Sequence, residues 1–127
     1  MGLDNGIYIK LHAETDIRGL VPVDDFGEIV EICYWRKCWG IRNDILSILN
    51  IPANTNDNNV EIHKEDIPRI ITLLKWYIQN DENWWYSQSP WERRDLIKPT
   101  KQFIKNLKWT YNRMDKRSFK VYFYDSY

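Results

Sequence analysis

Four stretches of the chain alternate between apolar and polar side chains, as the half-buried strands of a β-sheet do. Near the start, Ile7, Ile9 and Leu11 fall on one side of such a pattern. Near the end, an apolar series alternates with Lys and Tyr residues, and this is the clearest strand signal in the chain. We therefore expect β-strands at residues 6–14, 28–33, 60–62 and 118–124.

Three other stretches repeat their apolar residues at steps of three and four, which indicates amphipathic helices. In the first of them, Ile41, Ile45 and Ile48 recur at this spacing. His63 stands where an N-cap would precede the second helix, and Pro99 suits the first position of the third. We expect helices at residues 34–50, at 63–80, and from a start between 91 and 99 to about 111.

The order of these elements is strand, strand, helix, strand, helix, helix, strand. It predicts an α+β fold in which a small, mostly antiparallel sheet packs against about three helices. The 127 residues, 43% of them hydrophobic, suit a single domain spanning 1–127. Cys33 and Cys38 would point to different sides of one helix, so we expect two small buried hydrophobic residues rather than a disulfide.

No stretch approaches the roughly 18 consecutive apolar residues of a membrane-spanning helix. The first residues also lack the basic and apolar regions of a secretory signal. We therefore expect a cytoplasmic protein that makes no contact with a membrane.

The formal net charge is zero, but the two signs are segregated along the chain. Residues 1–92 hold 8 Lys and Arg against 15 Asp and Glu, whereas residues 93–120 hold 10 Lys and Arg against 2 Asp. On a helix, four lysines of the basic segment fall into one stripe opposite Phe103 and Leu107. These lysines are Lys98, Lys101, Lys105 and Lys108. The stripe fits a solvated helix face, the acidic half of a second copy, an acidic protein, or a nucleic acid or nucleotide.

Aromatic residues, 15% of the chain, gather in two further candidate sites. The first combines aromatic and basic side chains, which either recognise a base, phosphate or carboxylate or support each other internally. It consists of Tyr34, Trp35, Arg36, Lys37 and Arg42, beside Trp39. The second lies in a stretch without regular periodicity, and it either lines a pocket or anchors a partner, or it caps the core. It consists of Trp84, Trp85, Tyr86 and Trp91.

The sequence offers little for catalysis. His12, His63 and the two cysteines do not have zinc-ligand spacing, and no phosphate-binding loop, dinucleotide fingerprint or nucleophile elbow is present. We therefore expect no catalytic residue, no metal and no cofactor. A metal-dependent hydrolase stays as an alternative, built from Asp4, Asp24, Asp25 and Glu28.

Several short runs resemble a group of small phage and prophage proteins. They are the MGLD start at residues 1–4, the YWRK run at 34–37, the helix opening Glu65-Asp66-Ile67 and the aromatic end at 122–127. The chain departs from the group around Trp84 and in its longer basic tail. The resemblance implies a phage or prophage origin and action inside the cytoplasm of a bacterial host, and it carries over no functional residue.

Together these observations predict a small, non-enzymatic binding protein that engages a host protein or an anionic small ligand, in host take-over or anti-defence. The segregated charge also fits a homo-oligomer formed between acidic and basic halves. A nucleic-acid or nucleotide-binding protein and the metal-dependent hydrolase are the alternatives.

Overall fold

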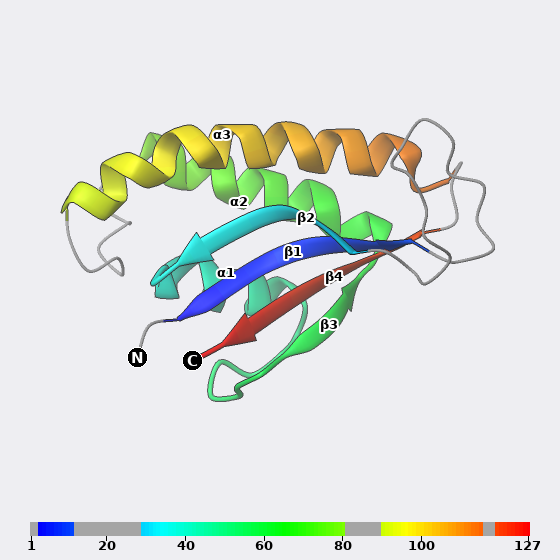
Figure 1. Ribbon diagram of the computed structural model, residues 1–127, viewed down its shortest axis with the longest axis horizontal. Coiled ribbons are helices and arrows are strands. Elements are labelled where there is room, and N and C mark those ends of the chain that lie inside the picture. The colour runs from blue at the N-terminus through cyan, green and yellow to red at the C-terminus, as the bar shows by residue number, and fades with distance from the viewer. Residues whose placement is uncertain (1–2, 12–28, 81–89, 116–118) are drawn as a thin grey trace.

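The computed structural model describes residues 3–11, 29–80, 90–115 and 119–127. These residues form four β-strands and three α-helices (Figure 1). The strands are β1 (Asp4–Leu11), β2 (Ile29–Arg36), β3 (Asn59–Ile62) and β4 (Phe119–Ser126). The helices are α1 (Trp39–Ile48), α2 (Ile67–Gln79) and α3 (Pro90–Arg113), with a 3-10 turn, η1 (Lys64–Asp66), directly before α2.

The four strands form one antiparallel sheet in the order β2-β1-β4-β3. In Figure 1 all three helices lie on one side of this sheet, with α1 and α2 behind it and α3 along its β2 edge. The arrangement confirms the expected α+β fold with a small antiparallel sheet. No helix of the described residues covers the opposite side, which we call the open face of the sheet.

The hydrophobic core lies between the sheet and the helices. Alternate residues of the central strands, among them Ile7, Ile9 and Phe123, point into it and are almost completely buried. Leu74 of α2 and Leu107 of α3 enter the same core from the helix side. Burying an aliphatic side chain of this size contributes about 1.5–3 kcal/mol. The period-two pattern of the strands therefore decides which side of the sheet the helices cover.

The boundary between β2 and α1 corrects the expected start of the first helix. The strand continues through Arg36, which pairs with Asp4 of β1, and α1 begins only at Trp39. Lys37 turns the chain between them with a φ of 61°, and its N–H donates to the carbonyl of Leu3 at 2.7 Å. Pairing with the central strand β1 therefore overrides the helical spacing of the apolar residues here.

The helix expected at residues 63–80 is confirmed. His63 is the N-cap of η1, and its backbone N–H donates to the Asp66 carboxylate at 3.1 Å, as in a capping box. Pro68 lies in the first turn of α2, where its missing N–H costs no helical hydrogen bond. The residues of α2 that are buried in the core are Ile67, Ile70, Leu74 and Tyr77.

Pro99 corrects the expected start of the third helix. α3 begins at Pro90, so Pro99 lies in the helix interior with its ring exposed. An interior proline removes one backbone hydrogen bond and crowds the preceding turn. The helix continues through it because Ile104 and Leu107 of the following turns are buried in the core.

Candidate binding surfaces

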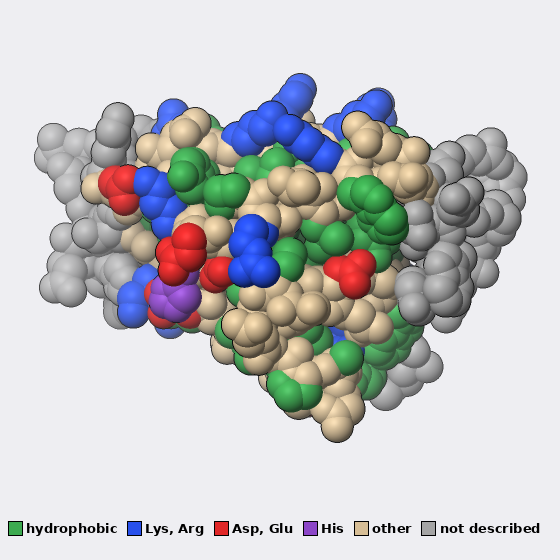
Figure 2. Space-filling view, turned by 180° about the vertical axis from the view of Figure 1, so that it is seen from behind, with side chains coloured by type: hydrophobic (Ala, Val, Ile, Leu, Met, Phe, Trp, Pro, Cys, Tyr) green, Lys and Arg blue, Asp and Glu red, His purple; other side chains and the backbone are tan. Residues whose placement is uncertain are grey.

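The predicted lysine stripe forms one side of α3. Its four lysines are all exposed, while Ile104 and Leu107 between them are buried. From Lys98 to Lys108 the helix rises about 15 Å, so the charges follow one another at about 5 Å intervals. Figure 2 shows Lys and Arg side chains gathered along the edge of the molecule that α3 forms. Among the described residues, no carboxylate forms a salt bridge with any of the four.

The other basic residues near the end of the chain do not extend this stripe. The Arg113 guanidinium lies 4.3 Å from the centre of the Trp109 ring. Lys120 belongs to β4, where it lies on the open face of the sheet, 3.9 Å from Glu61. The stripe is therefore a feature of α3 alone within the part of the chain that the structure describes.

Arg42, predicted beside aromatic residues, is buried in an internal network. Its side chain is 1% exposed, and its Nε lies 2.9 Å from Oδ2 of Asp125. Its Nη1 donates to the carbonyl of Ala53 at 2.7 Å. The guanidinium carbon lies 5.6 Å from the centre of the Trp39 ring and 5.0 Å from that of Tyr127. This geometry fits the internal alternative, in which cation and rings support each other.

The remaining members of that first aromatic group divide between the two sides of β2. Trp35 is fully buried on the helix side and donates to Oγ1 of Thr100 at 3.2 Å. Tyr34 and Arg36 are exposed on the open face, and Lys37 follows in the turn. Strand alternation therefore separates residues that a helix would have placed together. The second aromatic group is outside the described residues: Trp84, Trp85 and Tyr86 entirely, and Trp91 of α3 as to its side chain.

Sequence reasoning missed the four tyrosines at the centre of the open face. This tyrosine platform consists of Tyr8 on β1, Tyr34 on β2, and Tyr122 and Tyr124 on β4. The rings of Tyr8 and Tyr122 are stacked, with centroids 5.3 Å apart, and Tyr124 lies 6.0 Å from Tyr8. The signal was present in the strand pattern, because these tyrosines occupy its polar positions. Only the strand order brings them together.

Hydrogen bonds hold the rings of the platform across the sheet. Tyr8 on β1 donates to Oδ1 of Asn59 on β3 at 2.7 Å, and Tyr34 on β2 donates to Oδ1 of Asp4 on β1 at 2.5 Å. Tyr124 on β4 donates to the carboxylate of Glu31 on β2. The bonds from Tyr8 and Tyr124 each pass over an intervening strand. Those two rings therefore lie along the sheet rather than standing away from it.

The same contacts raise the pKa of two platform tyrosines. Partial burial raises the pKa of Tyr124 well above its usual value, and the hydrogen bond to Glu31 adds to this. The hydrogen bond to Asp4 raises the pKa of Tyr34, with partial burial as the second cause. Both effects favour the neutral phenol, since a phenolate would lose its bond to the carboxylate and face a negative charge.

We expect these tyrosines to ionise late when the folded protein is titrated with base. A pKa raised by folding contributes stability that is complete below the unfolded value, about 10, and is lost as the pH rises through the folded value. The free energy of unfolding should therefore fall above about pH 10 more steeply than in the Tyr34→Phe/Tyr124→Phe variant. Tyrosinate absorbance and urea unfolding measure the two effects. Ionisation of every tyrosine in one step near the usual pKa would contradict the expectation.

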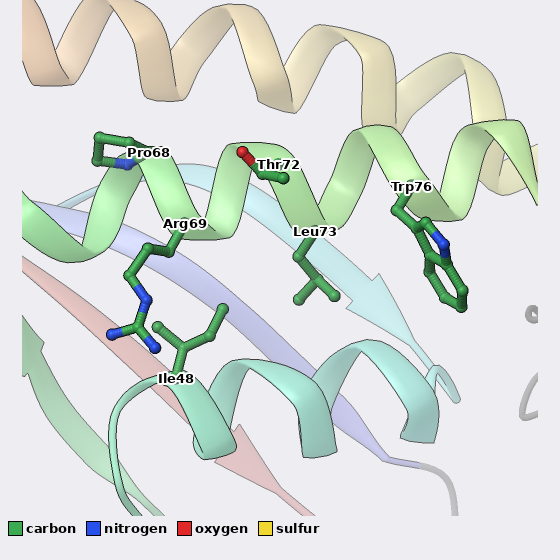
Figure 3. Close-up of a pocket in the computed structure, with 6 residues that line it drawn as sticks. All are labelled: Ile48, Pro68, Arg69, Thr72, Leu73 and Trp76. Carbon is green, nitrogen blue, oxygen red and sulfur yellow. The ribbon is translucent and has the colours of Figure 1, made fainter.

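A third surface is a shallow apolar hollow between α1 and α2, of about 560 Å³. In Figure 3, Arg69 and Trp76 lie toward its two ends, with Leu73 between them and Ile48 facing them from α1. The Trp76 side chain is 45% exposed, which is high for a residue of this size. Sequence reasoning did not single out this hollow, because Trp76 lies beside the buried stripe of α2 rather than on it.

Chemistry-bearing clusters are not found in the described residues. Among them, no three His, Cys, Asp or Glu side chains are grouped so that they could hold a metal ion. Asp4 of the hydrolase alternative accepts the Tyr34 hydrogen bond, while Asp24, Asp25 and Glu28 lie outside the described residues. None of the described helices is both long and apolar enough to cross a membrane. Comparisons with protein-family models, with curated proteins and with solved structures find no match.

Proposed function

We propose that the chain is a phage- or prophage-derived, non-enzymatic binding protein that engages an acidic face of a host protein through the lysine stripe of α3. The observation that carries this proposal is the stripe itself: four exposed lysines in a line, without a salt bridge to any described carboxylate. The site of action in this proposal is the cytoplasm of the bacterial host.

Electrostatics supports a partner at this surface. Lysines that follow one another at about 5 Å intervals add their potentials over several helical turns, which speeds the encounter with an acidic surface. Long, hydrated lysine side chains suit the rim of an interface, where charge sets the association rate and the choice of partner. The described carboxylates near the stripe do not neutralise it, so the field is available to another molecule.

An acidic protein fits the stripe better than a nucleic acid does. A nucleic-acid-binding domain carries a strong excess of positive charge, because affinity comes mainly from neutralising phosphates. This chain has a formal net charge of zero, and its uncompensated lysines form one row on one helix. An anionic small ligand would also need a recess, whereas the described stripe follows the convex side of α3.

The test is a quantitative pull-down from bacterial lysate. The stripe variant Lys101→Glu/Lys105→Glu reverses two charges in the middle of α3. The matched control Arg69→Glu/Lys75→Glu makes the same change in net charge on exposed positions of α2. We expect a host protein that the wild type and the control retain equally. The stripe variant should retain it at least about tenfold less, equal to about 1.4 kcal/mol.

The outcomes separate the proposal from its alternatives. Equal loss in the stripe variant and the control would mean that net charge alone decides, and equal retention by all three would remove the stripe from the interaction; either result contradicts the proposal. Recovered material that nuclease treatment removes, with a steep dependence on salt, would favour the nucleic-acid alternative instead.

A further inference from the structure

The open face of the sheet has the anatomy of a protein interface. Its centre is aromatic, made by the tyrosine platform around Gly6, which lies between Tyr34 on β2 and Tyr124 on β4. Charged side chains stand only at its periphery. They are Asp4, Lys10, Glu31, Arg36, Glu61 and Lys120. An aromatic centre with a charged rim is the distribution that distinguishes protein interfaces from the rest of a protein surface.

The platform is already ordered without a partner. Three of its hydroxyls are held by hydrogen bonds to Asp4, Glu31 and Asn59. Tyr122 is held instead by stacking on Tyr8. A tyrosine has few rotatable bonds, and here most of its freedom has been lost before binding. Contacts made by such side chains therefore lose little conformational entropy when a partner arrives.

The charges of the rim indicate the sign of the partner. Asp4 and Glu31 accept hydrogen bonds from tyrosines, and Glu61 lies 3.9 Å from Lys120. By contrast, Lys10 and Arg36 form no salt bridge with any carboxylate that the structure describes. The two stand at opposite ends of the platform, since Arg36 pairs with Asp4 and Lys10 lies six residues further along β1, about 20 Å away. The uncommitted charge of the rim is therefore positive.

We propose that the open face of the sheet is a second docking surface, which binds a folded protein carrying acidic residues around an uncharged contact area. This surface is separate from the lysine stripe of α3 and does not depend on it. The platform is too flat to enclose a small ligand, and the stacked rings offer contact area of the kind that binds protein surfaces.

Two other occupants fit the face less well. A nucleic acid would meet a surface whose three acidic and three basic residues cancel, so the electrostatic gain that drives such binding is missing. A second copy of the chain would bring the same open face. The three carboxylates of that face already have partners, so none is left to meet Lys10 and Arg36.

Site-specific photo-crosslinking in bacterial cells tests this proposal. A photoreactive phenylalanine derivative replaces Tyr122, whose side chain makes no hydrogen bond that an exchange would break among the described residues. In a parallel strain it replaces Trp76, which is 45% exposed on the helix side. We expect a discrete adduct with an acidic protein at position 122 and not at position 76.

Charge reversal of the rim completes the experiment. In a Lys10→Glu/Arg36→Glu background the adduct should fall at least about tenfold, because like charges at the rim oppose docking. The α3 variant Lys101→Glu/Lys105→Glu should leave it unchanged, so that a failure of the stripe proposal and a failure of this one give different results. Far-ultraviolet circular dichroism confirms that each variant is folded.

Four results would overturn the proposal. They are an adduct with the mass of two chains, a nuclease-sensitive adduct, the same adducts at positions 122 and 76, and no adduct at position 122. The first would assign the face to self-association and the second to a nucleic acid.

Discussion

Replacing Arg42 by methionine should destabilise the fold by about 3–5 kcal/mol, the usual cost of leaving one member of a buried ion pair alone. Asp125 would keep its charge at 3% exposure and lose its partner at 2.9 Å. The carbonyls of Ala53 and Thr55 would lose their donors as well. Urea unfolding followed by circular dichroism measures the change as a lower midpoint with an unaltered slope.

The network around Arg42 makes this effect large because it joins three distant parts of the chain. Arg42 of α1 reaches the end of β4 through Asp125 and the turn before β3 through Thr55. Asp125 in turn accepts hydrogen bonds from the backbone N–H of Asn58 at 2.8 Å and from its side-chain amide at 2.9 Å. Loss of the guanidinium therefore releases α1, the turn and the last strand together.

Two controls distinguish the network from general effects of the substitution. Arg36→Met, at an exposed position of β2, should change the free energy of unfolding by no more than about 0.5 kcal/mol. Arg42→Met/Asp125→Leu removes both charges and should recover part of the loss, since no unpaired charge then stays buried. A loss below about 1 kcal/mol for Arg42→Met alone would show that the pair is not a main support of the fold.

Much of the fold follows from local sequence pattern. The last strand and α2 were expected close to their observed positions because each has a strict period and a clear start, and their burial obeys that period. The α+β class follows from the order of such elements. The lysine stripe was predictable for the same reason, since positions on one helix need no knowledge of the rest of the fold.

Features that depend on pairing between distant segments could not be read from the sequence. The run at residues 34–36 has the spacing of a helix, but β1 holds it as a strand. The pair of Arg42 and Asp125 spans 83 residues, and nothing local distinguishes that arginine from an exposed one. The tyrosine platform needs the order β2-β1-β4-β3 and the register within it, both of which are properties of the whole sheet.

Gly6 lies at the centre of that sheet, and its replacement by alanine should destabilise the fold by about 2–3 kcal/mol. A Cβ atom at this position would collide with the backbone carbonyl oxygen of Cys33 and lie 2.9 Å from the Tyr124 ring. The ring could move aside, but a backbone oxygen in a paired strand cannot do so without opening the ladder between β1 and β2. Urea unfolding measures the loss.

The sign of this effect makes the prediction decisive. Glycine inside a strand ordinarily weakens it, so an alanine that fitted the space would raise stability by about 0.5–1 kcal/mol. A double-mutant cycle with Tyr124→Ser divides the cost between its two causes. If the ring contributes, the double variant should lose at least about 0.5 kcal/mol less than the sum of the single variants, and the remainder belongs to the Cys33 carbonyl. An alanine variant as stable as the wild type would mean that Tyr124 does not lie across Gly6, and the flat platform that the sheet offers a partner would then not exist.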